Sequence, residues 1–167
     1  HITGKKPKFY EEDVLHNVDM EIIMENENID GVIHFAAYKS VSESLEDPFS
    51  YYENNVGGLM NLMSAMKYND CTKIVFSSSC TVYGEPDVIP VNEQSPVKQA
   101  TTAYGSTKQV CEIMLRDNTW LDSIALRYFN PVGGHESGML GELPLGTPNN
   151  LVPYLTQTAA GIREQLT

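Results

Sequence analysis

A tyrosine and a lysine four residues apart, Tyr104 and Lys108, have the spacing in this sequence that most directly suggests chemistry. On a helix, residues at i and i+4 lie on one face, one turn apart. A phenol has an ordinary pKa of about 10, and a neighbouring ammonium favours the phenolate and lowers that pKa. The pair therefore predicts an acid/base group that handles the proton of an alcohol. A solvent-exposed surface pair is the alternative.

A serine cluster at positions 77–79 follows a short apolar segment, 73–76, which we interpret as a strand. A serine at a strand end can hydrogen-bond the oxygen of a bound alcohol and orient its proton. Together with Tyr104 and Lys108, such a serine suits the reversible oxidation of a secondary alcohol, with a nicotinamide taking the hydride.

The composition restricts the classes of protein that need considering. The 167 residues are enough for one hydrophobic core, and no apolar run approaches the ~20 residues of a membrane span. The 22 acidic residues outnumber the 11 basic ones and give a formal charge of -11, which argues against nucleic-acid binding. The amino end shows no signal-peptide pattern. We therefore expect a cytoplasmic protein that contacts neither membrane nor nucleic acid.

Cysteines and histidines do not predict a metal site. The three cysteines form no CxxC pair, and their odd number favours a reducing compartment. We interpret Cys80 as a small packing residue and His34, in an apolar segment, as a core histidine. The histidines show no ligand spacing; they are His1, His16, His34 and His135.

The pattern of apolar residues predicts alternating strands and helices. Strands are expected over 8–14, 31–37, 73–76 and 123–129, and helices over 18–27, 47–68, 104–117 and 153–164, with a glycine-containing loop after 131. Such alternation is typical of βαβ units and a mainly parallel sheet. Ligands of these sheets bind at the carboxyl ends of the strands. Those ends are predicted at Asp13, at 35–37, at 77–79 and at 129–130.

Several sequence blocks, taken in order, resemble the extended short-chain dehydrogenase/reductase family, most closely its UDP-galactose 4-epimerases. They are Val-Ile-His-Phe-Ala at 32–36, Tyr-Tyr-Glu-Asn-Asn-Val at 51–56, Phe-Ser-Ser-Ser-Cys-Thr-Val-Tyr-Gly at 76–84, Tyr-Gly-Ser-Thr-Lys at 104–108, Leu-Arg-Tyr-Phe-Asn-Pro-Val-Gly-Gly at 126–134 and Pro-Asn-Asn-Leu-Val-Pro-Tyr at 148–154. The resemblance implies a Rossmann-like, doubly wound, mainly parallel α/β sheet.

The same resemblance implies a role for individual residues. Tyr104 would be the base and Ser79 its partner, and Lys108 would hold the nicotinamide ribose and tune Tyr104. Ser77 and Ser78 would then be capping or loop groups. The implied NAD-binding residues are Asp13, Val14, Phe35, Ala36, Ala37, Lys39, Asn54, Tyr104, Lys108 and Phe129. The implied residues for the UDP-sugar are Ser79, Tyr104, Asn130, Asn150 and Leu151.

The implied reaction interconverts UDP-galactose and UDP-glucose. It oxidises the sugar at C4 to a bound 4-ketose, which turns over in the site before the hydride returns to its other face. NAD is regenerated and stays bound. The resemblance also implies a homodimer, for which the apolar-striped helices at 47–68 and 103–117 are the expected contact surface.

One motif of the family is missing from this sequence. The Gly-x-x-Gly-x-x-Gly loop that cradles a pyrophosphate at a helix amino end does not occur in the chain. We therefore expect the fold without its first glycine-loop βα unit and interpret the chain as a middle fragment of an epimerase. Residues 1–130 would be a partial NAD-binding domain and residues 131–167 the start of the substrate-binding region.

Two other functions stay open. A nucleotide-sugar 4,6-dehydratase of the same superfamily would have Thr-Asp-Glu where this chain has Ser79-Cys80-Thr81. The chain could also be a non-catalytic fragment that folds or dimerises without binding a cofactor.

Overall fold

This computed structural model describes residues 2–142, 144, 146, 148 and 150–165. The chain divides into two compact units. One unit spans Phe9–Phe129, and the other combines His1–Lys8 with Asn130–Thr167. The candidate catalytic residues all fall within Phe9–Phe129.

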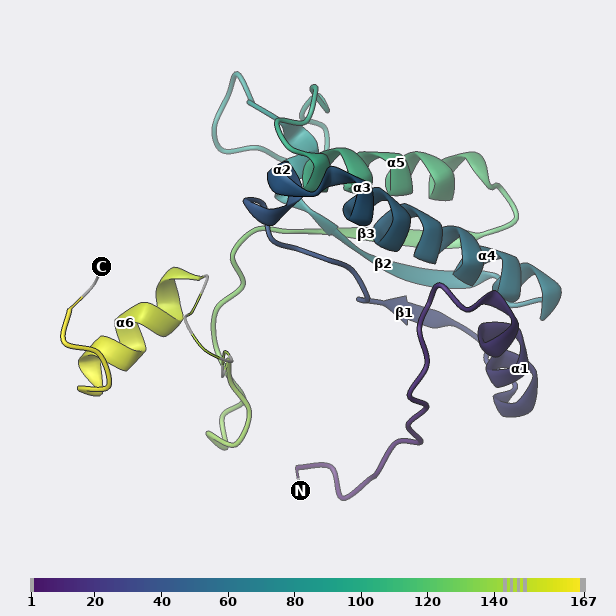
Figure 1. The fold of residues 1–167 in the computed structure, drawn as a ribbon, viewed down its shortest axis with the longest axis horizontal. Helices are drawn as coiled ribbons and strands as arrows, with labels where there is room; N and C mark the ends of the chain where they lie inside the picture. Colours follow the sequence, from purple (N-terminus) through teal and green to yellow (C-terminus); the bar gives the residue numbers. More distant parts are fainter. Residues whose placement is uncertain (1, 143, 145, 147, 149, 166–167) are drawn as a thin grey trace. The chain divides into compact units, whose positions relative to one another are not determined.

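A parallel sheet of three strands organises the unit Phe9–Phe129 (Figure 1). Its strands β1 (Val32–His34), β2 (Lys73–Ser79) and β3 (Asp122–Tyr128) lie in the order β1-β2-β3. The register pairs Ile33 with Val75, and Val75 with Ile124. All three strands therefore end at the same edge of the sheet, and the predicted Rossmann-like α/β fold with a parallel sheet is confirmed.

The helical segment between β1 and β2 is interrupted at Asp47, and from Pro48 to Tyr68 it runs without a break but not uniformly. It comprises α2 (Glu43–Glu46), α3 (Pro48–Tyr51), the π-helix η1 (Tyr52–Gly57) and α4 (Gly58–Tyr68). The Asp47 side chain caps α3 by accepting a hydrogen bond from the Ser50 backbone N–H at 3.2 Å, and Pro48 occupies the first turn. The predicted helix 47–68 is thus confirmed, with a turn of π-helix in its middle. The helix α1 (Asn17–Glu27) packs against α4.

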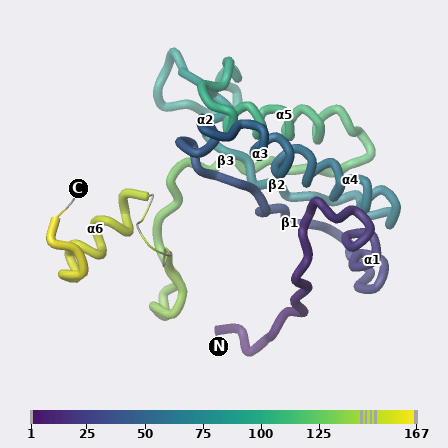
Figure 2. The backbone as a smooth tube through the Cα atoms, in the orientation of Figure 1, coloured from purple at the N-terminus to yellow at the C-terminus, as the bar shows by residue number. Residues whose placement is uncertain are grey.

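The connection between β2 and β3 contains the short 3₁₀ helix η2 (Cys80–Tyr83) and then α5 (Ala103–Asp117). The Thr102 hydroxyl caps α5 by accepting a hydrogen bond from the Gly105 N–H at 3.1 Å. This cap fixes the start of the helix at Ala103, one residue before the predicted start at Tyr104. Figure 2 traces the path of the backbone from β2 into α5 and on to β3.

The core lies between the sheet and the helices α4 and α5, which Figure 1 shows on one side of the strands. Strand β2 alternates, so that Ile74 and Phe76 are 2% and 1% exposed while Val75 between them is half-buried. The predicted methionine stripe on α4 is packing surface at Met63 and Met66, which are buried. The core cluster comprises Met24, Leu59, Leu62, Met63, Ala65, Met66, Cys71, Ile74, Phe76, Cys111, Leu115 and Leu121.

Three sequence predictions need correction. The strand expected over 8–14 is wrong, because Asp13 forms a turn there. Its carboxylate accepts a hydrogen bond from the Leu15 N–H at 2.9 Å, and its carbonyl accepts one from the His16 N–H at 2.9 Å. Strand β2 also extends to Ser79, so Ser77 and Ser78 are strand residues and not loop groups. The last helix, α6 (Leu151–Ala159), begins and ends earlier than the expected 153–164.

Among the residues that the structure describes, no helix has the length and apolar character needed to cross a membrane.

Candidate active site

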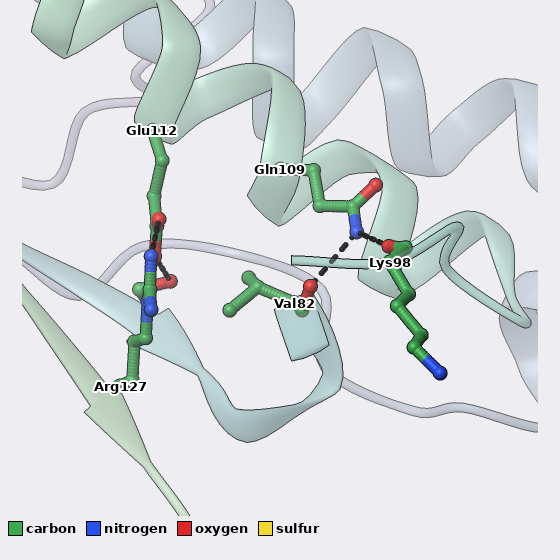
Figure 3. A network of polar contacts seen from close by, with 6 residues as sticks. Val82, Lys98, Gln109, Glu112 and Arg127 are labelled. Carbon is green, nitrogen blue, oxygen red and sulfur yellow. Dashed lines mark hydrogen bonds and ion pairs between the residues drawn. The ribbon is translucent and has the colours of Figure 1, made fainter. Parts of the chain in front are cut away.

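Helix α5 presents Tyr104 and Lys108 in its first two turns, close to the end of β2. Gly105 makes this approach possible, since a Cβ at that position would lie 3.2 Å from the Thr81 carbonyl oxygen and 3.1 Å from the Ala100 Cβ. Gln109 fastens the helix to the same turn, because its side-chain N–H₂ donates to the Val82 carbonyl at 2.8 Å and the Lys98 carbonyl at 2.6 Å (Figure 3). Helix α5 is therefore anchored to η2 in the turn that follows Tyr104.

Lys108 is buried at 3% exposure against the end of the sheet. Its ammonium donates to the Ser77 carbonyl at 2.8 Å and lies 4.9 Å from the centroid of the Phe76 ring and 5.8 Å from that of Tyr104. Burial lowers the pKa of Lys108, since a charged group loses its hydration there. Burial, and secondarily the Lys108 charge, lowers the pKa of His34 to about 4. His34 is thus a neutral core histidine at neutral pH, stacked on Phe76.

Tyr104 stands edge-on to the ring of Tyr51, with the ring centroids 6.5 Å apart. Burial raises the pKa of Tyr104, and the hydrogen-bonding influence of Ser79 only partly offsets this effect. The expectation that Lys108 lowers this pKa is therefore wrong for this structure. The physical reason is that the Lys108 ammonium is directed at the Ser77 carbonyl, while the phenol itself is half-buried.

Ser79 is the last residue of β2 and is 7% exposed. Its hydroxyl oxygen accepts hydrogen bonds from the Thr81 backbone N–H at 3.2 Å and from the Thr81 hydroxyl at 3.0 Å. Two donors on one oxygen orient the hydroxyl and leave its own proton available to another acceptor. The structure therefore brings Ser79, Tyr104 and Lys108 to one strand end, as the sequence predicted.

A buried asparagine that the sequence reasoning missed holds the neighbouring strand end. Asn55, within η1, is 2% exposed. Its side-chain carbonyl accepts the Tyr38 N–H at 2.8 Å, and its N–H₂ donates to the Tyr38 carbonyl at 3.0 Å and to the Thr107 hydroxyl at 3.2 Å. The amide thus ties the segment after β1 to α5. The sequence signal for it is the Asn-Asn pair at 54–55, in which the resemblance implies a role only for Asn54.

A pocket of about 580 Å³ opens beyond the end of β1. Five predicted cofactor-binding residues line it: Asp13, Val14, Ala36, Ala37 and Asn54. The Asp13 carboxylate and the Asn54 amide supply acceptors and a donor for the hydroxyl groups of a ribose, and the small alanine side chains leave room for it. The volume is typical of a ligand site. A larger pocket of about 720 Å³, lined by residues such as Gly31, Lys73 and Asp122, lies at the opposite end of the strands and contains no predicted site residue.

The remaining predicted residues are less enclosed. Phe35 and Phe129 are 64% and 58% exposed, and Lys39 is also exposed. The Phe129 ring lies 6.5 Å from that of Tyr83. Asn130, Asn150 and Leu151 belong to the second unit, where the Asn150 side chain donates to Glu142 at 2.7 Å. Their predicted contact with a sugar nucleotide stays a prediction.

One group of side chains among the described residues has ligand atoms close enough to hold a metal ion. Glu12, His16 and Asp19 bring such atoms within 4.8 Å of one another. The sequence did not predict this grouping, because the turn at 13–16 that creates it was not foreseen. Carboxylates on a protein surface commonly cluster in this way, so the grouping carries no functional conclusion.

Residues 1–160 match the sequence model of the NAD dependent epimerase/dehydratase family. UDP-glucose 4-epimerase of Yersinia enterocolitica is 46% identical over 164 residues, which cover 96% of this chain and 49% of that protein. The Haemophilus influenzae UDP-glucose 4-epimerase is 47% identical over 169 residues, covering 99% of this chain and 50% of that protein.

A solved structure shares the fold of this chain. The crystal structure of UDP-glucose 4-epimerase from Bifidobacterium longum in complex with NAD⁺ and UDP superposes with a TM-score of 0.92 at 45% identity. The match covers 99% of this chain and 50% of that one. The present chain thus spans about half the length of the relatives it matches.

Proposed function

We propose that this chain, which belongs to the NAD dependent epimerase/dehydratase family, carries the catalytic groups of a UDP-glucose 4-epimerase. The observation that carries the proposal is the convergence of Ser79, Tyr104 and Lys108 at the carboxyl end of β2. The relatives named UDP-glucose 4-epimerase and the fold they share with this chain support it. The substrates would be UDP-galactose and UDP-glucose.

In the proposed reaction Tyr104 exchanges a proton with the O4 hydroxyl of the sugar. Bound NAD would supply the hydride acceptor for C4 and the hydride donor for the return. Ser79 donates its hydroxyl proton to the sugar oxygen, since its own oxygen is already occupied by two donors from Thr81. The raised pKa of Tyr104 keeps the phenol protonated at rest. Deprotonation then requires the Lys108 ammonium or the Ser79 hydroxyl to bond the phenolate more closely.

Other residues of the chain would hold the cofactor. We assign its adenosine end to the pocket that Asp13, Val14, Ala36, Ala37 and Asn54 line, and Phe35, Lys39 and Phe129 to the remainder. Lys108 would bond the nicotinamide ribose. The residues that would contact the sugar nucleotide are Asn130, Asn150 and Leu151, which belong to the second unit. Residues 1–130 would be part of the NAD-binding domain, and residues 131–167 would be the start of the substrate region.

We also propose that the protein is a cytoplasmic homodimer that pairs through the segment 47–68 and α5. Several large apolar side chains on these helices are exposed, among them Met60 at 57% and Ile113 at 44%. Sedimentation should show a dimer for the wild-type protein and a weaker one for Met60→Lys. A monomer at every concentration would reject the dimer.

The function is tested by turnover of UDP-galactose. The complete gene product that contains these 167 residues is incubated with UDP-galactose, and UDP-glucose is measured. Tyr104→Phe should lower the rate by about 10²–10⁴-fold, since it removes the acid/base group. Tyr68→Phe, at a residue that is 70% exposed, is the matched control and should keep wild-type activity.

The outcomes of this experiment distinguish the epimerase from the two other functions that the sequence leaves open. Absence of UDP-glucose with the wild-type gene product would reject the epimerase, and a 4-keto-6-deoxy product would indicate a dehydratase instead. The sequence Ser79-Cys80-Thr81 lacks the carboxylate that a dehydratase would place there. Turnover by the complete gene product but not by the 167-residue chain would mark the chain as a catalytically incomplete part.

A further inference from the structure

A carboxylate on the third turn of α5 has no part in the roles assigned so far. Tyr104, Lys108 and Glu112 follow one another at i, i+4 and i+8 and so lie along one face of the helix. The Glu112 side chain is 15% exposed, and that of Arg127 on β3 is 22% exposed. Glu112 Oε1 accepts from Arg127 Nε at 3.0 Å and Oε2 from Arg127 Nη2 at 2.6 Å (Figure 3). The pair is bidentate and links α5 to β3.

The same carboxylate also holds the catalytic end of β2. Its Oε1 accepts a third hydrogen bond, from the Ser78 hydroxyl, and Ser78 is the register partner of Arg127. Ser78 lies between Ser77, whose carbonyl accepts from Lys108, and the proposed catalytic Ser79. Consecutive turns of α5 therefore bond consecutive residues of the strand end, Lys108 to Ser77 and Glu112 to Ser78.

Arg127 also connects this pair to Phe129, one of the proposed cofactor-binding residues. Its guanidinium carbon lies 4.8 Å from the centroid of the Tyr83 ring, which is 4% exposed. That ring in turn lies 6.5 Å from the ring of Phe129, two residues after Arg127. The guanidinium group thus lies against Tyr83, the last residue of η2, while its N–H groups donate to Glu112 on α5. These contacts leave the Arg127 side chain few alternative orientations.

We infer that Glu112 and Arg127 are positioning residues, which fix Ser79 and Phe129 relative to Tyr104 and Lys108. The inference rests on the proposed function. A purely stabilising role would not need charges, since a half-buried ion pair is often replaced by apolar side chains without loss of stability. An apolar pair cannot reproduce the geometry of these hydrogen bonds. Three directed hydrogen bonds hold α5, β2 and β3 at set distances from one another.

The double variant Glu112→Met/Arg127→Met of the complete gene product tests this inference, because it leaves no unpaired charge behind. We expect an unfolding temperature close to that of the wild type, and a kcat about 10- to 100-fold lower at an unchanged KM for UDP-galactose. Arg127→Lys keeps the charge but loses the bidentate geometry, and its kcat should lie between those of the wild type and the double Met variant. The matched control is Arg116→Gln/Asp117→Asn, an exposed ion pair on the same helix, and it should behave as the wild type.

A second measurement does not depend on turnover. Cys80 follows Ser79 and is partly exposed, whereas Cys71 and Cys111 are buried. Loosening of the strand end should raise the rate of Cys80 alkylation by iodoacetamide by about threefold in the double Met variant and not in the control. Unchanged kcat and unchanged alkylation in a folded double Met variant would overturn the inference. So would a loss of activity that only parallels the loss of folded protein.

These readouts distinguish the inference from the proposed function. If the wild-type gene product does not convert UDP-galactose, the proposed function fails, and the Cys80 alkylation rate alone decides whether the pair holds the strand end. If the wild type converts UDP-galactose and the double Met variant does so equally well, the function stands and the positioning role is rejected.

Discussion

On one face of the sheet, Ile74 and Phe76 lie beneath the helices at 2% and 1% exposure, whereas on the opposite face Ile33 and Ile124 are 65% and 59% exposed. The topology accounts for this contrast. The strands are added in one direction, β1 to β2 to β3, and parallel crossovers are nearly always right-handed. Successive crossovers therefore place their helices on the same face.

The two faces also differ in their polar groups. The covered face holds buried polar side chains, including His34, Asn55, Ser78 and Lys108, which are at most 5% exposed. Such groups require partners, and each hydrogen bond fixes the position of a helix against a strand. The exposed face carries apolar residues with little to orient them. Chemistry that depends on position is therefore expected where helices and strands supply partners to each other, at the carboxyl end of the covered face.

The largest expected effect is the loss of a covered aromatic residue. Phe76→Ala should destabilise the chain by about 3–5 kcal/mol, because it removes a fully buried ring and leaves a cavity. Ile124→Ala, on the exposed face, should cost less than about 1 kcal/mol, because little area is buried there. Urea unfolding of both variants measures the difference. Equal losses would show that the exposed face is buried in solution and would break the comparison.

The next effect is a dependence of stability on pH that arises from the covered face. Burial lowers the pKa of His34 to about 4 from 6.5, so between these values the unfolded chain binds more protons than the folded one. The contribution of His34 to the free energy of unfolding is therefore fully present above pH 6.5. It is lost as the pH falls toward 4, by roughly 3 kcal/mol in total. His34→Phe should flatten this part of the pH profile of urea unfolding.

The smallest effect concerns two adjacent glycines at the start of α4. A Cβ on Gly58 would lie 2.8 Å from Val14 Cγ2, whereas a Cβ on Gly57 would lie 3.6 Å from Leu15. Gly58→Ala should therefore destabilise the chain by about 1–2 kcal/mol, and Gly57→Ala should be neutral or stabilise it by up to about 1 kcal/mol. Thermal unfolding gives both values. A neutral Gly58→Ala would mean that the segment carrying Asp13 and Val14 moves away without cost.

Local patterns were sufficient to predict most of the elements that carry the site. The apolar spacing of 47–68 and 104–117 predicted two helices, and the apolar run before the serine cluster predicted β2. The prediction over 8–14 failed because the aromatic and apolar residues there resemble a strand, while the Asp13 turn depends on hydrogen bonds that only the folded backbone reveals. The π-helix η1 has no apolar pattern of its own, and the sequence could not predict it.

The electrostatics of the site could be predicted only in part. The spacing predicted that Tyr104 and Lys108 share one helix face. The direction in which the pKa of Tyr104 shifts depends on burial, which tertiary packing determines. Glu112 and Arg127 were missed for a related reason. They are 15 residues apart on a helix and a strand, and no short-range motif connects them.

The bond between Asn55 and Tyr38 has a consequence for local opening of the protein. Tyr38 lies in no helix or strand, yet the buried Asn55 amide engages both its N–H and its carbonyl as a neighbouring strand would. The Tyr38 amide hydrogen should then exchange with deuterium as slowly as those of η1, because both are released by the same opening. The rim of the pocket beyond β1 and the helical interior of the domain would thus form one cooperative unit.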